Sequence, residues 1–476
     1  MIGRSGKMET GDRMPGWKAE VASNGHGGPG ARAAVLLFLL LPGLTFVGCA
    51  SHSRRVRDAR VAYDQGDLDR ASELLQAARK SRSGDRDCLV LDQAMVSLVQ
   101  GNTAEAERQL REVRDRFDFL EQKAVGEQTL ALVTDDTAMA YGGEDYEKIM
   151  IRAMLALSNL MQDGADAVAY CLQVDQKQRE IIAQSQESSP GAPEPVYRHV
   201  ALGAYLRGIL QEESLLHYDD ARRAFGEVAR WEPEFELARY DLQRVQTGVH
   251  SSRGNGVVYL FAMVGRGPIK EESVAEATSA ALLIADRILS ATGKQTLPPT
   301  IAPVKIPEVV VPPCAIDSVA VAVDDRPCGL SQTVTDVGRL AWQQCEANRN
   351  RRIAQAVVRR SLKKAAIYSV KEVAGVESPL AGVAYDAAGV LWEATEKADT
   401  RGWDLLPAKV QVLRIELPAG IHQLSLRPAR NGQPLGPLYQ TQVGVVDGRN
   451  TYVLATFPGP RLVGKILTSG SGPLRK

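Results

Sequence analysis

The part of the chain between about residues 51 and 249 repeats a helical pattern at a fixed spacing. Gly66 and Gly101 are 35 residues apart, and Ala71 and Ala106 are also 35 residues apart. Apolar residues recur between them at the spacing of one helix face. A glycine can end a helix in the left-handed conformation, and a small alanine lets the next helix approach closely. The spacing therefore predicts that this region is an all-helical domain of stacked hairpins.

A later stretch repeats the second half of this unit, with a proline where the unit ends. Its residues are Tyr218, Ala221, Phe225, Val228 and Pro233. The unit resembles the tetratricopeptide repeat, a helix–turn–helix motif of about 34 residues. The resemblance implies that residues 49–250 form an array with a concave groove for a protein partner. A generic helical bundle with alanine-rich packing, or a purely structural scaffold, is the alternative.

A basic segment and a short apolar run precede the helical region. The run AAVLLFLLLPGLTFVGC covers residues 33–49, and Arg32 comes directly before it. A basic segment, an apolar core and a small residue at the cleavage point are typical of a secretory signal. The run is too short for a comfortable membrane-spanning helix, and Pro42 interrupts it. Residues 1–48 are therefore predicted to be a signal peptide.

The last four residues of the run carry a second resemblance. Phe46–Cys49 resembles the lipobox of bacterial lipoproteins, with Phe46 where leucine is usual. In that family the cysteine is acylated and becomes the new amino terminus. The resemblance implies that Cys49 anchors an exported protein to a membrane, and Ala50 in place of aspartate implies the outer membrane, facing the periplasm. An ordinary secretory signal with an unmodified cysteine is the alternative.

The composition changes after residue 250 from helical to mixed. Residues 251–375 are predicted to be a mixed region, with a strand at 257–262, a helix over 273–289, a proline-rich extended segment at 297–313, a strand at 315–323, a turn at 326–329 and a helix over 336–373. Residues 376–476 are predicted to be β-rich, with a helix at 377–398 and strands at 409–417, 421–428, 440–446 and 451–457. The expected fold is α+β and multidomain: a helical hairpin array, a mixed α/β region and a small antiparallel β domain.

Five cysteines remain besides Cys49, and an exported protein can form disulfides. They are Cys88, Cys171, Cys314, Cys328 and Cys345. Cys314 and Cys328 flank a short hairpin-like stretch and are the preferred pair. Cys88 and Cys171 lie in helical patterns, where buried apolar roles are more typical. An odd number leaves at least one thiol outside any intramolecular pair.

Motifs for chemistry are absent from the sequence. Basic and acidic residues balance at 57 each, so no global charge favours nucleic acid as a partner. The histidines show no metal-ligand spacing, and no catalytic residue or cofactor site is predicted. Gly265–Lys270 follows a strand and contains glycines, but Glu271 and Glu272 after Lys270 would repel a phosphate. Trp403 is predicted to be a packing anchor.

One local charge cluster stands out, in the predicted helix over residues 336–373. Its members are Arg349, Arg351, Arg352, Arg359, Arg360, Lys363 and Lys364. A basic helix face can contact anionic lipid headgroups, an acidic polymer or an acidic partner. The alternative, which we favour, is a core helix with a solvated basic face.

Three segments together carry a family resemblance. They are Tyr141–Leu160, Gly265–Lys270 and Ala398–Ala408. With the lipobox, they resemble a family of uncharacterised bacterial lipoproteins with tetratricopeptide-like repeats. The resemblance implies location and architecture, and it transfers no catalytic residue.

These patterns predict a membrane-anchored envelope lipoprotein that acts as a scaffold or adaptor for a protein partner, and not an enzyme. Two alternatives remain open. One is an accessory protein or enzyme of cell-wall metabolism, and the other is a binder of envelope polysaccharide through the C-terminal β domain.

Overall fold

The computed structural model describes residues 52–80, 84–126, 140–188, 199–291, 302–373 and 397–469. Cys49, the predicted signal peptide and the predicted helix at 377–398 lie outside these residues, except for the last two positions of that helix. Helices and strands both contribute extensively to the described residues, so the mixed α and β composition is confirmed.

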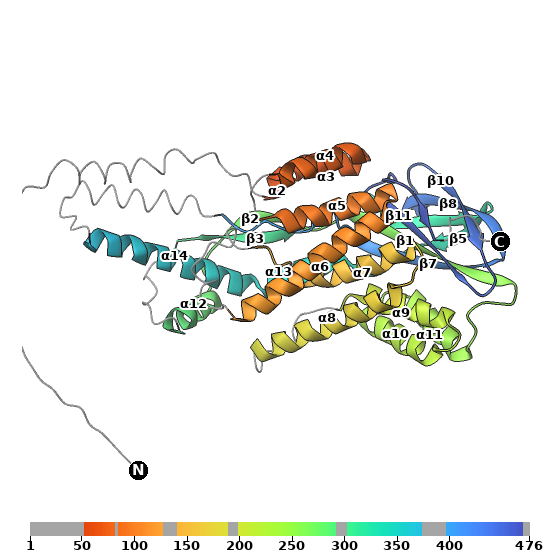
Figure 1. Ribbon diagram of the computed structural model, residues 1–476, viewed down its shortest axis with the longest axis horizontal. Coiled ribbons are helices and arrows are strands. Elements are labelled where there is room, and N and C mark those ends of the chain that lie inside the picture. The colour runs from red at the N-terminus through yellow and green to blue at the C-terminus, as the bar shows by residue number, and fades with distance from the viewer. Residues whose placement is uncertain are drawn as a thin grey trace, which may run out of the picture. The chain divides into compact units, whose positions relative to one another are not determined.

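The first half of the described chain is helical, as predicted. Its helices are α2 (His52–Arg55), α3 (Arg57–Gln65), α4 (Leu68–Arg79), α5 (Arg86–Gln100), α6 (Thr103–Gly126), α7 (Asp145–Leu160), α8 (Ala167–Ser188), α9 (Ala201–Glu213), α10 (Tyr218–Trp231) and α11 (Leu237–Thr247). Each helix from α3 onward packs against the next one in the chain, which gives a continuous array (Figure 1).

The predicted helix ends at two glycines and the predicted close packing at two alanines are confirmed. Gly66 and Gly101 end α3 and α5 in the left-handed conformation, with φ of 82° and 89°. Ala71 and Ala106 are fully buried between neighbouring helices. The glycines stop one helix and the alanines admit the next, because neither position tolerates a larger side chain without strain.

The second half of the described chain builds sheets and three further helices. Its elements are β1 (Asn255–Arg266), β2 (Ile269–Ala275), α12 (Ser279–Ala291), β3 (Val304–Val310), β4 (Ser318–Val323), β5 (Arg326–Leu330), β6 (Gln332–Asp336), α13 (Val337–Ala347), α14 (Arg349–Val373), β7 (Pro407–Pro418), β8 (Gly420–Arg430), β9 (Gln433–Pro434), β10 (Tyr439–Val445), β11 (Asn450–Phe457) and β12 (Leu467–Thr468). One sheet has the order β12-β11-β1-β7-β6, and a second has the order β10-β8-β4-β5 with β9 beside β8.

Strand β1 is the centre of the first sheet, and it is buried on both faces. Tyr259 and Phe261 point into the core shared with the helical array. Leu260 and Ala262 point into the core shared with the second sheet. Because successive side chains of a strand alternate between faces, one continuous apolar run serves two cores. The sheet therefore lies between the helices and the second sheet.

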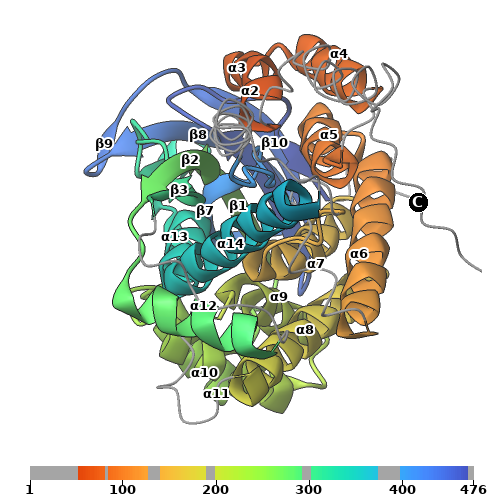
Figure 2. The ribbon, with the colours of Figure 1, turned by 90° about the vertical axis from the view of Figure 1, so that its left-hand side faces the viewer.

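A third core joins the two-stranded β2–β3 sheet to α12 and α14. Ala281 and Ala285 of α12, Ile306 of β3, and Ile353 and Val357 of α14 are all buried in it. Helix α12 packs across α14 (Figure 2). Helix α13, which leads into α14, contacts α7 of the helical array.

The predicted domain boundaries do not separate independent domains. Strand β1, placed in the mixed region, pairs in parallel with β11 and antiparallel with β7, both placed in the C-terminal β domain. Residues 51–476 form one compact unit. The predicted small antiparallel domain over 376–476 is therefore wrong, because its strands complete a sheet whose central strand comes from elsewhere in the chain.

Several predicted elements also need correction. The predicted helix over 273–289 begins only at Ser279, because residues 269–275 form strand β2. The segment at 326–329 is strand β5, and the turn before it is made by Asp324 and Asp325, with φ of 48° and 63°. Two residues with positive φ suit a tight hairpin turn. The long helix at 336–373 is divided at Asn348 into α13 and α14.

Candidate functional site

One side of the helical array is already covered by the protein itself. Almost every residue of α5 and α7 is buried. The segment before β7 lies along them: the Leu405 N–H donates to Asp92 at 2.9 Å, and the Trp403 N–H donates to Glu147 at 2.8 Å. The Trp403 side chain is fully buried, which confirms its predicted packing role. A partner therefore has no access to this side of α5 and α7.

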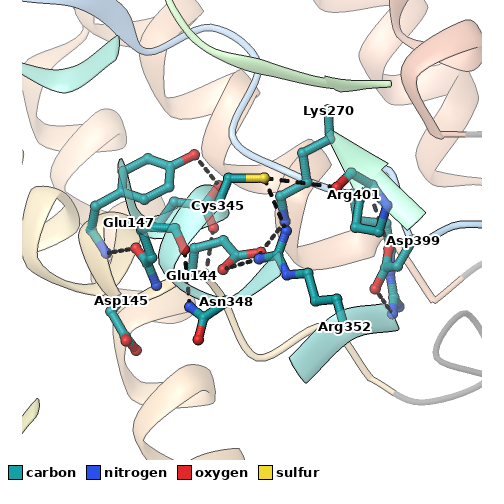
Figure 3. Close-up of polar contacts among 12 residues, drawn as sticks. Glu144, Asp145, Glu147, Lys270, Cys345, Asn348, Arg352, Asp399 and Arg401 are labelled. Carbon is teal, nitrogen blue, oxygen red and sulfur yellow. Dashed lines mark hydrogen bonds and ion pairs between the residues drawn. The ribbon is translucent and has the colours of Figure 1, made fainter. Parts of the chain in front are cut away.

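A buried ionic network lies where this segment meets α7, β2 and α14 (Figure 3). The Lys270 ammonium pairs with Glu144 and lies 3.2 Å from the Tyr141 hydroxyl. The Arg352 guanidinium donates to both carboxylate oxygens of Glu144 at 3.0 Å. Three parts of the chain are thus held together by charge-assisted hydrogen bonds, which are stronger than neutral ones.

Glu147 is the acceptor at the centre of the network. One of its oxygens accepts the Tyr141 hydroxyl at 2.6 Å and the Glu144 N–H at 2.9 Å. The other accepts the Trp403 N–H and, at 3.4 Å, the Tyr146 hydroxyl. Burial raises the pKa of Glu147, while the Lys270 charge opposes that effect. The carboxyl group fixes the start of α7 and the 399–406 segment in one geometry.

The pKa shifts in the network keep Glu144 and Lys270 charged, which suits a structural role. Burial opposes the charged form of Glu144, but Lys270 and Arg352 outweigh it and lower its pKa to about 2. Burial also disfavours the Lys270 ammonium, but Glu144 and Glu147 outweigh that effect and raise its pKa. A lysine with a raised pKa stays protonated, so it is not available as a nucleophile.

The three segments that carried the family resemblance meet at this network. Tyr141–Leu160 supplies Glu144 and Glu147, Gly265–Lys270 supplies the ammonium, and Ala398–Ala408 supplies the Trp403 N–H. The glycine-rich stretch therefore does not form a phosphate loop. It connects β1 to β2, and its lysine is buried against a carboxylate. No sequence spacing signals this convergence, because the three segments are far apart in the chain.

A second buried cluster links the first described residues to α5 and the same segment. The His52 ring lies 2.8 Å from the Asp85 carboxylate. Burial lowers the pKa of His52, but the hydrogen bond to Asp85 and the nearby charge of Asp404 raise it overall. Burial raises the pKa of Asp92 to about 8, and the Asp404 charge adds to the shift. Arg60 donates to Asp404 at 3.1 Å.

A pocket of about 300 Å³ opens beside this cluster. Helix α3 forms one wall, and the β1–β2 connection, the start of β7 and its preceding segment form others. Asp404 and Arg60 belong both to the buried cluster and to the pocket lining. Gly267 permits the close approach of two walls, since a Cβ there would lie 2.1 Å from the Leu406 carbonyl oxygen.

The predicted basic face of α14 is not one exposed patch. Arg352 points inward to Glu144. Arg360 is buried, and its guanidinium donates to the carbonyl oxygens of Ala302 and Pro303 at 2.9 Å each. These two side chains turn inward because they satisfy a buried carboxylate and unpaired backbone carbonyls. The prediction of a shared patch is therefore wrong at these positions.

The remaining members of the predicted patch are dispersed. Arg351 is exposed, while Arg349 and Arg359 are half-buried. The side chains of Lys363 and Lys364 lie outside the described residues. The described part of α14 is thus a core helix with a few solvated cations.

The predicted disulfide between Cys314 and Cys328 is not formed. All five described cysteines are free. Cys314 precedes β4 and lies 4.0 Å from the Pro458 carbonyl oxygen. Cys328 lies in β5, where its sulfur is 3.4 Å from the Arg326 carbonyl oxygen. The two thiols therefore contact different backbone carbonyl groups. The turn that leads into β5 lies at residues 324–325, which is closer to Cys328 than to Cys314.

The described residues contain neither a cluster suited to a metal ion nor a helix suited to cross a membrane. No group of three or more histidine, cysteine, aspartate or glutamate side chains is placed to hold a metal ion in this part of the chain. No described helix combines the length and the apolar character that a bilayer crossing requires. His199, one of the scattered histidines, stacks on Trp231 with ring centroids 4.1 Å apart.

Comparisons with known proteins assign no family. No protein-family model, no curated protein and no solved structure matches the chain.

Proposed function

We propose that this protein is an exported envelope lipoprotein, anchored through Cys49, whose folded part is a non-catalytic adaptor for a protein partner. The observation that carries the proposal is the apolar run that ends in Phe46–Cys49, directly before the folded unit. His52, only three residues after Cys49, is already buried against Asp85. Three residues span at most about 10 Å, so an acylated Cys49 would hold the folded unit at the bilayer surface.

The buried networks support a binding role over a catalytic one. Lys270, Glu144 and Glu147 are held by several partners each and secure segments of the fold. Catalysis requires groups that are placed to meet a substrate, whereas these groups are enclosed by the segments that they join. An adaptor needs a rigid unit, and this arrangement supplies one.

The covered side of α5 and α7 changes which surface the proposed adaptor uses. A partner in the array's inner groove, as the repeat resemblance implies, would compete with Trp403 and Leu405 for the same helices. The adaptor surface is therefore a part of the array that the 403–405 segment does not cover, which we call an outward face. The α9–α10 turn offers exposed apolar side chains for such a contact, since Leu215 and Leu216 are both exposed.

The test compares the wild-type chain with Cys49→Ser in cells, after labelling with a fatty-acid analogue. We expect the label and the membrane fraction to retain the wild type and to lose Cys49→Ser. Cys328→Ser is the matched control, since Cys328 is a half-buried free thiol at the edge of the second core, and it should be labelled and fractionate as wild type. A Cys49→Ser protein that still carries the label would contradict the anchoring proposal.

Crosslinking in cells followed by mass spectrometry tests the adaptor role. We expect one envelope protein to crosslink to the wild type through outward faces of the array. Loss of that crosslink in Leu216→Asp, with the overall fold unchanged by circular dichroism, would support the α9–α10 turn as part of the contact. Crosslinks confined to the second sheet would contradict an adaptor that works through the array.

A further inference from the structure

We infer that the pocket beside α3 binds a small amphipathic anion, with one carboxylate or phosphate head and a short apolar body. The inference stands on the residues that line the pocket and does not depend on acylation of Cys49. It goes beyond the adaptor role, because it assigns the protein a small-molecule ligand.

The pocket rim carries guanidinium groups that are available to an anion. One face of α3 supplies Arg57, Arg60 and Asp64, which lie three or four residues apart. Arg57 is exposed and forms no ion pair with any residue that the structure describes. Arg266 extends from the end of β1 and has only a long contact of 3.7 Å with Asp64. Guanidinium groups bind carboxylates and phosphates through paired hydrogen bonds.

The third guanidinium on the rim is already committed. Arg60 donates to Asp404 at 3.1 Å and to the Ser53 carbonyl oxygen at 3.0 Å. This pairing cancels the Asp404 charge within the pocket lining. Arg57 is then left as an uncompensated cation, since Arg266 and Asp64 offset one another. The rim therefore favours a ligand with a single negative charge.

Apolar groups supply a little more than half of the pocket lining. Met95 of α5, Met263 of β1, Ile269 of β2 and the neighbouring Leu405 and Leu406 line it. Methionine side chains adapt to irregular apolar groups. A lining that combines apolar side chains with guanidinium groups suits a ligand that carries both characters.

The volume limits the size of the ligand. A pocket of about 300 Å³ has the liquid volume of about ten water molecules. That space accepts roughly a dozen non-hydrogen atoms and lies at the small end of ligand sites. A nucleotide or an oligosaccharide is too large, whereas a fatty acid of medium length fits.

The test measures binding of octanoate to the purified full-length protein by isothermal titration calorimetry. Octanoate supplies one carboxylate and a short apolar chain, while acetate supplies the head alone and 1-octanol the chain without the charge. We expect octanoate to bind at least about tenfold more tightly than either, because each lacks one of the two interactions.

Three variants connect that binding to the pocket. Arg57→Gln removes the free guanidinium and should raise the Kd of octanoate about tenfold. Val61→Trp should block the entrance, since Val61 lines the pocket and is exposed, so neither change disturbs a core. Arg351→Gln, an exposed arginine of α14, is the matched control and should bind as wild type. Equal binding by Val61→Trp and wild type, or no octanoate binding at all, would overturn the inference.

Competition distinguishes two sources of the same chemistry. Vesicles of phosphatidylglycerol in phosphatidylcholine present an anionic head and acyl chains at a surface. If they displace octanoate from the wild type, the ligand is a membrane lipid. If only free octanoate occupies the pocket, the ligand is a free amphipathic acid. Either result supports the site, and equal binding of the vesicles themselves by Val61→Trp and wild type would place the lipid contact elsewhere.

Discussion

Replacing Lys270 by methionine tests whether the buried ionic network holds the fold together. Methionine keeps most of the apolar stem of lysine and removes only the ammonium. The Lys270 side chain is 4% exposed and that of Glu144 is 18% exposed, so the pair is largely shielded from water. Removing one partner of a buried pair costs about 3–5 kcal/mol, because the other charge stays buried. Arg352 still contacts Glu144, so the lower end of that range is expected.

The pKa of Glu144 gives an independent magnitude. Its surroundings lower the pKa from about 4.5 to about 2, and a displacement of that size corresponds to about 3 kcal/mol. The folded-state pKa is depressed, so this stability is present above pH 4.5 and is lost as the pH falls toward 2. We therefore expect Lys270→Met to lower the free energy of unfolding by about 3 kcal/mol at pH 7, and by less near pH 3.

Urea unfolding followed by circular dichroism between pH 3 and pH 7 measures both effects. The matched control is Glu346→Gln, which breaks the Arg349–Glu346 pair, whose side chains are 41% and 40% exposed. An exposed pair contributes about 0–1 kcal/mol. If Lys270→Met were no more destabilising than Glu346→Gln, the network would not be a structural lock and the reasoning would be refuted.

Three further predictions concern a buried carboxyl group, a strained glycine and two free thiols. Burial and Asp404 raise the pKa of Asp92 to about 8, so folding at pH 7 must protonate a carboxyl group. Asp92→Asn should therefore be more stable than wild type by about 2–4 kcal/mol at pH 7 and equal to it near pH 4, as measured by urea unfolding. Gly143→Ala should destabilise the protein by about 2–3 kcal/mol in the same assay, because Gly143 has φ of 77° and a Cβ there would lie 2.4 Å from a buried aromatic ring. Cys314 and Cys328 should both react with a maleimide in unfolded, unreduced protein. A protein mass lower by two hydrogens, with neither of these two cysteines labelled, would show a disulfide and contradict the free thiols.

The sequence predicted the helical half well because its signals are local. Gly66 and Gly101 end helices through their own backbone conformation, and each is read from a window of a few residues. Ala71 and Ala106 pack against helices next to them in the chain. Neither feature depends on contacts with distant segments.

The arrangement of the sheets depends on contacts that no local pattern contains. Leu260 of β1 pairs with Val453 of β11 and with Leu413 of β7, and both partners lie more than 150 residues away in the chain. The run at 257–262 was recognisable as a buried strand, but its partners were not. An apolar run that is buried on both faces carries no alternation that would identify which strands flank it. The predicted domain boundary failed for this reason.

The candidate site shows the same limit for charged residues. Lys270, Glu144 and Arg352 read in the sequence as ordinary surface charges, and Lys270 is followed by two acids. Their burial is decided by where α7, β2 and α14 meet. A buried charge is tolerated only when an opposite charge and hydrogen bonds compensate it, so these residues became significant only as a set.

Charge compensation also favours ligand binding at the pocket over a further structural role for its rim. Three cations of the described fold are paired with carboxylates: Lys270 and Arg352 with Glu144, and Arg60 with Asp404. Arg57 stands beside the last of these pairs, on the same helix face, and has no ion pair among the described residues. Because Arg57 holds no part of the described fold in place, its guanidinium is left to bind an anion from solution at the pocket.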